Sequence, residues 1–276
     1  NGVHWDTYST EIRSAYDDSV YTGQQGFAFW DCFSAPSGGY PASVPQPLGH
    51  GAVPADVIGR YSTVVWVGND FQGDLNSWLE TPIQSYLEAG GNVLLLSRRS
   101  ANFLDDNLTA YLGISWAETA SQLGNCVAVV PELQSMAFIG TQTWNDVYRT
   151  AVGPHTTVLL HDTTGFGATR AIGARVVPPE GGTHRPDGGQ LVHISARPYR
   201  LDHQPLRANT QVILGQYFGE PYGTVTAAPG DGEVAPAAVV SLGAAYPNPF
   251  NPQTVIPLRL PARSRAETGM VFTPVP

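Results

Sequence analysis

Residues 61–97 read YSTVVWVGNDFQGDLNSWLETPIQSYLEAGGNVLLLS and decide the fold class. Two uniformly apolar runs, at 62–67 and 92–96, predict strands that are buried on both faces. The segment between them predicts a helix over 75–89, in which Pro82 is expected to produce a kink or a break. The apolar residues of this helix recur every four positions: Leu75, Leu79, Ile83 and Leu87. Strand, helix and strand in this order predict an α/β domain.

The same alternation extends over the first 222 residues. Further strands are predicted at 26–30, 157–160, 172–177 and 189–194, and further helices at 6–19, 102–112 and 205–218. We therefore predict one α/β domain over residues 1–222, with a doubly wound, mostly parallel sheet that has helices on both faces. Gly2 and Val3 resemble the exit of a strand, so the first strand of this domain is expected to be clipped.

The composition changes after this domain. Residues 223–241 are rich in Ala, Pro and Gly and have neither helical nor strand periodicity, which is typical of a linker. Residues 242–276 are predicted to form a separate, short module.

The charged residues exclude several classes of function. All 14 basic residues are Arg, and with 23 acidic residues the formal net charge is −9. Nucleic-acid binding is not expected, because it needs a basic face. The absence of Lys excludes Schiff-base chemistry and a lysine-dependent phosphate loop. No apolar run approaches the ~18 residues that span a bilayer, and no signal peptide is visible after Asn1.

The cysteines and histidines predict no metal site. Cys32 and Cys126 can pair in an oxidising compartment or remain small buried hydrophobes in a reducing one, and both alternatives stay open. No Cys-x-x-Cys pair or His–Cys cluster is present, so structural zinc is not expected. No cofactor is expected either. Two histidine pairs are candidate metal ligands: His155 with His161, and His184 with His193. Neither pair has a neighbouring carboxylate cluster, so solvated or core histidines are expected instead.

The most specific motif lies in the tail, where residues 242–256 read LGAAYPNPFNPQTVI. Closely spaced prolines and turn-forming Asn residues indicate an extended segment that leads into a strand over 254–260. The segment resembles the start of the C-terminal sorting domain of type IX secretion substrates, an immunoglobulin-like β-module. The resemblance covers residues 242–261 only, so the module is expected to be truncated. Its motif residues are Tyr246, Pro247, Asn248, Pro249, Phe250, Asn251 and Pro252.

Residues 61–70 and 86–97 are similar to the class I glutamine-amidotransferase-like fold, which is flavodoxin-like in layout. In active members a glycine-flanked cysteine nucleophile occupies the turn after the second of these strands. Here that turn reads Ser97-Arg98-Arg99-Ser100. The partner histidine of the family matches His193, which falls within a predicted strand with no acid before Asp202. The resemblance therefore implies this fold without the catalytic triad, a pseudo-enzyme.

Ligands of open α/β sheets bind beyond the carboxyl ends of the strands. Ser97 is a candidate nucleophile with His193 as its base, although a serine at a strand end is usually a turn or cap residue. The candidates for an anion site are Arg98, Arg99, Arg197 and Arg200, since Arg binds carboxylate and sulfate bidentately. The simpler alternative is that they form salt bridges to Asp31, Asp70 or Asp202. Residues expected at these ends are Asp31, Asn69, Asp70, Ser97, Arg98, Arg99, Arg197 and Arg200.

The leading functional hypothesis is a non-catalytic accessory or binding domain of a secreted or cell-surface bacterial protein. The tail would engage the type IX secretion machinery, and any catalysis would lie in an upstream part of the protein. A hydrolase that uses Ser97 is the second hypothesis. The third is a glycan-binding module, in which an exposed Trp stacks on a sugar or another extracellular ligand is held.

Overall fold

The computed structural model describes residues 28–220 and four short strands between 241 and 259. The gaps within 28–220 are 43, 69–73, 115, 121–123, 141–144, 150–154, 164–169 and 178–188. The contacts divide the chain into two units, Asn1–Val225 and Thr226–Pro276. The helix predicted at 6–19 lies outside the described residues. No helix in the described ranges is long and apolar enough to cross a membrane.

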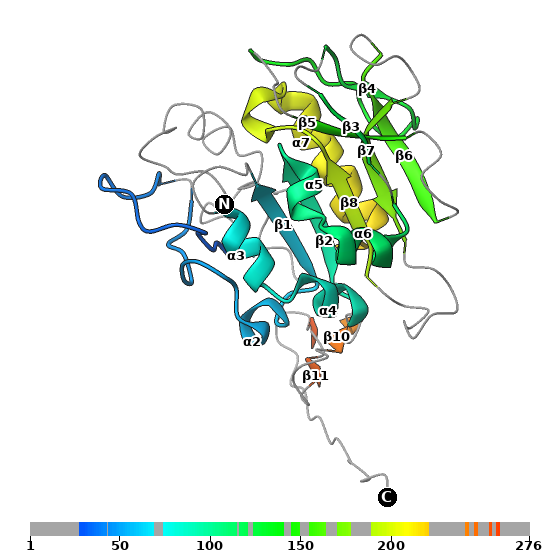
Figure 1. The fold of residues 1–276 in the computed structure, drawn as a ribbon. Coiled ribbons are helices and arrows are strands. Elements are labelled where there is room, and N and C mark those ends of the chain that lie inside the picture. Colours follow the sequence, from blue (N-terminus) through cyan, green and yellow to red (C-terminus); the bar gives the residue numbers. More distant parts are fainter. Residues whose placement is uncertain are drawn as a thin grey trace, which may run out of the picture. The chain divides into compact units, whose positions relative to one another are not determined.

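Three parallel strands form the part of the sheet that the sequence predicts best (Figure 1). They are β1 (Thr63–Gly68), β2 (Asn92–Ser97) and β8 (Leu191–Ile194), in the order β1-β2-β8. Val64 pairs with Val93, and Leu95 pairs with both Trp66 and His193. Strand β2 is central among them, and its leucines are 0% exposed, which explains the uniformly apolar sequence.

The rest of the sheet is antiparallel, so the expectation of a mostly parallel sheet is wrong for the sheet as a whole. Strand β7 (Arg170–Val176) runs antiparallel to β8 and also pairs with β6 (Thr156–His161). The connection from β6 to β7 consists of residues 162–169 only. It is shorter than the dozen or more residues that a parallel crossover connection needs. Three further strands extend this part: β3 (Trp116–Ala120), β4 (Val127–Ala128) and β5 (Asn145–Arg149).

One face of the sheet is covered by short helices: α3 (Asp74–Glu80), α4 (Ile83–Glu88), α5 (Ser100–Phe103) and α6 (Asp106–Leu112). The break between α3 and α4 falls at Pro82, as predicted. The helix predicted over 102–112 is instead two helices. Asp105 caps α6 by accepting a hydrogen bond from the Leu108 amide (2.9 Å), which is the usual role of Asp before a helix. Helix α2 (Ala55–Ile58) precedes β1.

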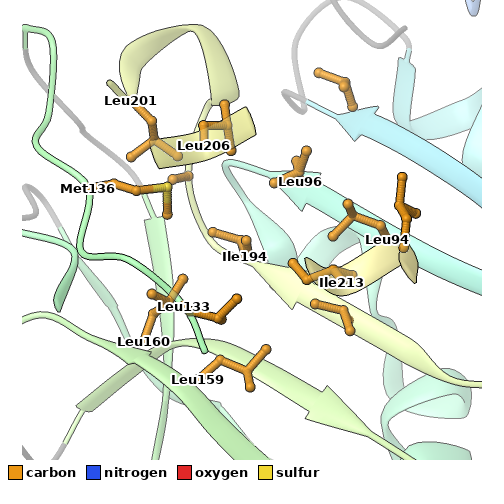
Figure 2. Packing of buried hydrophobic residues seen from close by; sticks show 14 of the residues in the cluster. Leu94, Leu96, Leu133, Met136, Leu159, Leu160, Ile194, Leu201, Leu206 and Ile213 are labelled. Atoms are coloured by element: carbon orange, nitrogen blue, oxygen red, sulfur yellow. The ribbon is translucent and has the colours of Figure 1, made fainter. Parts of the chain in front are cut away.

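The other face is covered by α7 (His203–Val212), which continues as a π-helical turn, η2 (Ile213–Tyr217). Figure 2 shows Leu206 and Ile213 of this element together with Leu94, Leu96 and Ile194 of the sheet. Leu133 and Met136, which follow β4, belong to the same buried cluster. Helices therefore flank the sheet on both faces, in agreement with an α/β fold.

Of the strand predicted at 26–30, the structure describes residues 28–30, and these form no strand. The next residue, Asp31, makes a single bridge with His50. The Trp30 indole donates to the Gly51 carbonyl (2.8 Å) and fixes this segment as a loop. Cys32 and Cys126 are both buried, and no disulfide joins them. They belong to the two different core clusters, so the two thiols are not joined.

The described part of the second unit consists of two short antiparallel pairs. Strand β9 (Ser241–Leu242) pairs with β12 (Leu258–Arg259), and β10 (Tyr246–Pro247) pairs with β11 (Thr254–Val255). The first two residues of the proline motif thus lie in a strand. Residues 248–252 of the motif lie outside the described residues.

Candidate site at the carboxyl ends of the parallel strands

The parallel strands β1, β2 and β8 bring most of the predicted site residues to one edge of the sheet. Gly68, the last residue of β1, pairs with Ser97, the last residue of β2. The Arg98 amide donates to the Gly68 carbonyl (3.3 Å), and α5 begins two residues later at Ser100. The chain therefore passes from strand to turn to helix directly after Ser97.

Ser97 and His193 are in contact, as the second hypothesis requires. Ser97 Oγ lies 3.2 Å from His193 Nε2. The register explains this contact: Leu95 pairs with His193 on neighbouring strands, and Ser97 lies two residues further along the same face. A hydroxyl and an imidazole at this distance form a hydrogen bond.

Two further serines complete a hydrogen-bonded network that the sequence did not suggest. Ser100 Oγ lies 3.0 Å from Ser97 Oγ and 3.4 Å from Ser195 Oγ, and it also donates to the Ser97 carbonyl (3.2 Å). The period of two along β8 places Ser195 on the face of His193, and this spacing is the signal that could have revealed it. We refer to Ser97, Ser100, His193 and Ser195 as the hydroxyl–imidazole network.

The hydroxyl–imidazole network is closed to solvent, since all four residues are 0% exposed. Burial lowers the pKa of His193 to about 3, because desolvation disfavours the charged imidazolium. The imidazole is therefore neutral at pH 7. A nucleophile must reach the substrate to react with it, and in this structure Ser97 Oγ faces buried protein atoms.

The four predicted arginines lie just beyond this network. Arg98 and Arg99 follow β2 directly, and Arg99 is the residue before α5. Arg197 precedes the short 3-10 helix η1 (Pro198–Arg200), and Arg200 ends it. All four arginines are partly exposed, whereas the serines that lie near them in the sequence are buried.

Two of the three acids expected to pair with these arginines, Asp31 and Asp202, make other hydrogen bonds, and the third, Asp70, lies outside the described residues. Asp31 is 0% exposed, and its carboxylate accepts from the Tyr40 hydroxyl (2.8 Å) and the Phe33 amide (3.0 Å). Burial raises the pKa of Asp31, and these two hydrogen bonds oppose that shift. Asp202 caps α7 through the Gln204 amide (3.1 Å). Among the described residues, no ion pair joins Asp31 or Asp202 to an arginine.

The remaining predicted site residues can be placed only in part. Asn69 and Asp70 lie outside the described residues, as does His184. His161 ends β6, and burial lowers its pKa. In the part of the chain that the structure describes, no group of three or more His, Cys, Asp or Glu side chains is placed to hold a metal ion.

Comparisons with known proteins add little to this geometry. The chain matches no family model and no curated protein. Solved structures that match it include the mmIFT52 N-terminal domain, which is 10% identical, with a TM-score of 0.43. That match covers 71% of this chain and 99% of the other domain.

Proposed function

We propose that this chain is a non-catalytic binding domain of a secreted or cell-surface bacterial protein that the type IX secretion machinery exports through the tail. The observation that carries the non-catalytic part is the complete burial of Ser97 and His193, with 0% exposure of both. A serine that ends a strand and bonds to two buried polar neighbours, here Ser100 and His193, is typical of a structural residue. Among the described residues at this edge, the four arginines reach solvent, and arginine binds ligands without reacting with them.

The glutamine-amidotransferase-like assignment is part of this proposal. Its support is the strand–turn–helix passage at Ser97 and the order of three parallel strands with helices on both faces. The antiparallel strands beyond β8 are an addition to such a layout. In the tail, the pairing of β9 with β12 and of β10 with β11 is compatible with the start of an immunoglobulin-like module.

Export is tested with the full chain behind a signal peptide in a bacterium that has type IX secretion. We expect the protein at the outer surface or in the medium, and we expect it to be retained in the periplasm when residues 246–252 are replaced by a Gly/Ser sequence. A matched control replaces seven linker residues, 228–234, in the same way and should still be exported. Equal export of both variants would contradict a role of residues 246–252 in export.

A hydrolase remains the second candidate because Ser97 Oγ lies 3.2 Å from His193 Nε2. A transient opening of the turn before α5 would expose this pair. The protein would then hydrolyse a small activated ester, such as p-nitrophenyl acetate, faster than free imidazole does. We expect no such turnover. Hydrolysis that disappears in Ser97→Ala and persists in the control Ser85→Ala would establish the hydrolase instead.

A further inference from the structure

A separate group of polar side chains lies where β7 meets η2, away from the strand ends that carry Ser97. The guanidinium carbon of Arg175, in β7, lies over the ring of Tyr217, in η2, at 4.3 Å from the ring centroid. Arg175 Nε donates to Gln190 Oε1 (2.8 Å), and Gln190 Nε2 donates to the Tyr217 carbonyl (2.9 Å). Stacking and hydrogen bonding together restrict the guanidinium to one position. The cation is therefore placed before any ligand arrives, which lowers the cost of binding.

Glu132 lies at the hydroxyl end of the same tyrosine. Its Oε1 accepts a hydrogen bond from the Tyr217 hydroxyl (2.7 Å). This hydrogen bond lowers the pKa of the Glu132 carboxyl, and the positive charge of Arg175 lowers it further. Glu132 is exposed to solvent and is therefore negatively charged at neutral pH.

The segment that carries Glu132 is anchored to the helix beside it. Leu133 is buried in the core cluster that α7 covers. The Gln134 amide donates to Asn209 Oδ1 (2.7 Å), and Asn209 Nδ2 donates back to the Gln134 carbonyl (2.8 Å). These two hydrogen bonds join the segment to α7, which continues into η2. The carboxylate is therefore attached to a fixed part of the fold.

Arg175 and Glu132 carry opposite charges beside one tyrosine, yet within the described residues no ion pair joins them. Each is held by an uncharged group instead. Gln190 takes one N–H of the guanidinium, and the Tyr217 hydroxyl takes one oxygen of the carboxylate. A guanidinium has several N–H donors and a carboxylate several lone-pair sites, so both groups can bond to a further partner. A single ligand that carries both complementary charges would satisfy the two groups together.

We propose that Arg175, Tyr217 and Glu132 bind a small zwitterion, with the chemistry of a free amino acid or a short peptide. The ligand carboxylate accepts charge-assisted hydrogen bonds from Arg175, and the ligand ammonium donates to Glu132. This inference rests on the proposed binding function and names a class of ligand for it. Its failure would leave the non-catalytic assignment standing, because that assignment depends on the burial of Ser97 and His193.

The test is a ligand-observed NMR titration of the full chain, at neutral pH and low ionic strength, with glycine, diglycine and triglycine. We expect at least one of them to bind. Its N-acetylated and C-amidated forms each lack one charge and should bind about tenfold more weakly. Tightest binding of glycine identifies an amino acid as the ligand, and tighter binding of a longer member identifies a peptide. Binding of none of the three, or equal binding of the blocked forms, overturns the proposal.

Charge variants identify which end of the ligand each residue binds. Arg175→Gln should remove the preference for the zwitterion over its C-amidated form, and Glu132→Gln the preference over its N-acetylated form. Arg60→Gln and Glu80→Gln are the matched controls, because they remove the same charges at other exposed positions. Equal losses of affinity in the controls would reduce the binding to general charge attraction and contradict a site. Circular dichroism of each variant verifies that it is folded.

A variant that alters no charge tests Tyr217 as a positioning residue. Tyr217→Phe keeps the ring under Arg175 but releases Glu132, so the affinity for the zwitterion should fall severalfold. The preference over the N-acetylated form should shrink, whereas the preference over the C-amidated form should persist. Tyr86→Phe is the control, because it removes a hydroxyl that donates to the Tyr61 carbonyl (2.9 Å) at another place in the fold. Unchanged preferences in Tyr217→Phe contradict the role of its hydroxyl.

Discussion

The hydroxyl–imidazole network and the arginines occupy the same two strand exits but opposite environments. Ser97 and Ser195 are 0% exposed, whereas Arg98 and Arg197, one and two residues later, are partly exposed. Hydroxyl and neutral imidazole groups can be buried when they bond to one another. A guanidinium keeps its charge at any ordinary pH and must stay near water or an anion. The residues that resemble a catalytic pair are therefore interior, whereas the arginines that follow them reach the surface.

The largest effect on stability is expected for His193→Ala. The change leaves a cavity in the core and removes the partner of Ser97 Oγ, so the free energy of unfolding should fall by about 3 kcal/mol. Urea denaturation measures it. A loss below about 0.5 kcal/mol, the range of ordinary surface substitutions, would mean that His193 is not a buried structural residue and that the contrast between the two regions fails.

Acidification should destabilise the fold through the same residue. The pKa of His193 is lowered from 6.5 to about 3 in the fold, so the unfolded chain takes up the proton first. The stability due to neutral His193 is complete above pH 6.5 and declines as the pH falls toward 3. Between pH 7 and pH 5 the difference should be about 2 kcal/mol.

The control for this pH effect is His193→Gln, which has no titrating ring. The wild type should lose about 2 kcal/mol more than this variant between the two pH values, by urea denaturation at each. Parallel losses in the two proteins would show that His193 is accessible to protons in the fold.

Ser100→Ala is expected to have an intermediate effect. It removes the hydroxyl that bonds to Ser97 and Ser195 and leaves those buried groups with fewer partners, at a cost of about 1 kcal/mol. Ser85→Ala, in α4, is the matched control outside the network. Thermal unfolding of both should separate them, and equal melting temperatures would contradict a structural role for Ser100.

The smallest effect on stability is expected for Arg99→Gln and Arg197→Gln. Surface substitutions usually change the free energy of unfolding by less than about 0.5 kcal/mol, and neither arginine is buried. Denaturation curves of both variants should superpose on that of the wild type. A loss comparable to that of His193→Ala would make these arginines structural.

The parallel part of the sheet was predictable because its strands are buried on both faces. Such strands leave a continuous apolar sequence, as in Leu94, Leu95 and Leu96, and the intervening helix is marked by its period and by Pro82. The antiparallel strands carry mixed sequences, and their order depends on contacts between distant segments. The pairing of β7 with β8 on one edge and with β6 on the other has no local signal.

The residues of the candidate site could be predicted from the sequence, but their burial and hydrogen-bond partners could not. The strand ends identified Ser97, Arg98, Arg99 and Arg197, because parallel strands end together. Burial is a tertiary property, so the sequence did not show that Ser97 and His193 are enclosed. Nor did it show that Asp31 bonds to Tyr40, nine residues away, instead of to an arginine.

The most direct test of the account is the reactivity of Ser97 toward a fluorophosphonate probe, followed by intact mass measurement of the full chain at neutral pH. We predict no adduct on the folded protein, because the Ser97 hydroxyl is enclosed and bonded to Ser100 and His193. An adduct that forms on the wild type and is absent in Ser97→Ala would show an accessible, activated nucleophile. That result would contradict the binding domain and establish a hydrolase.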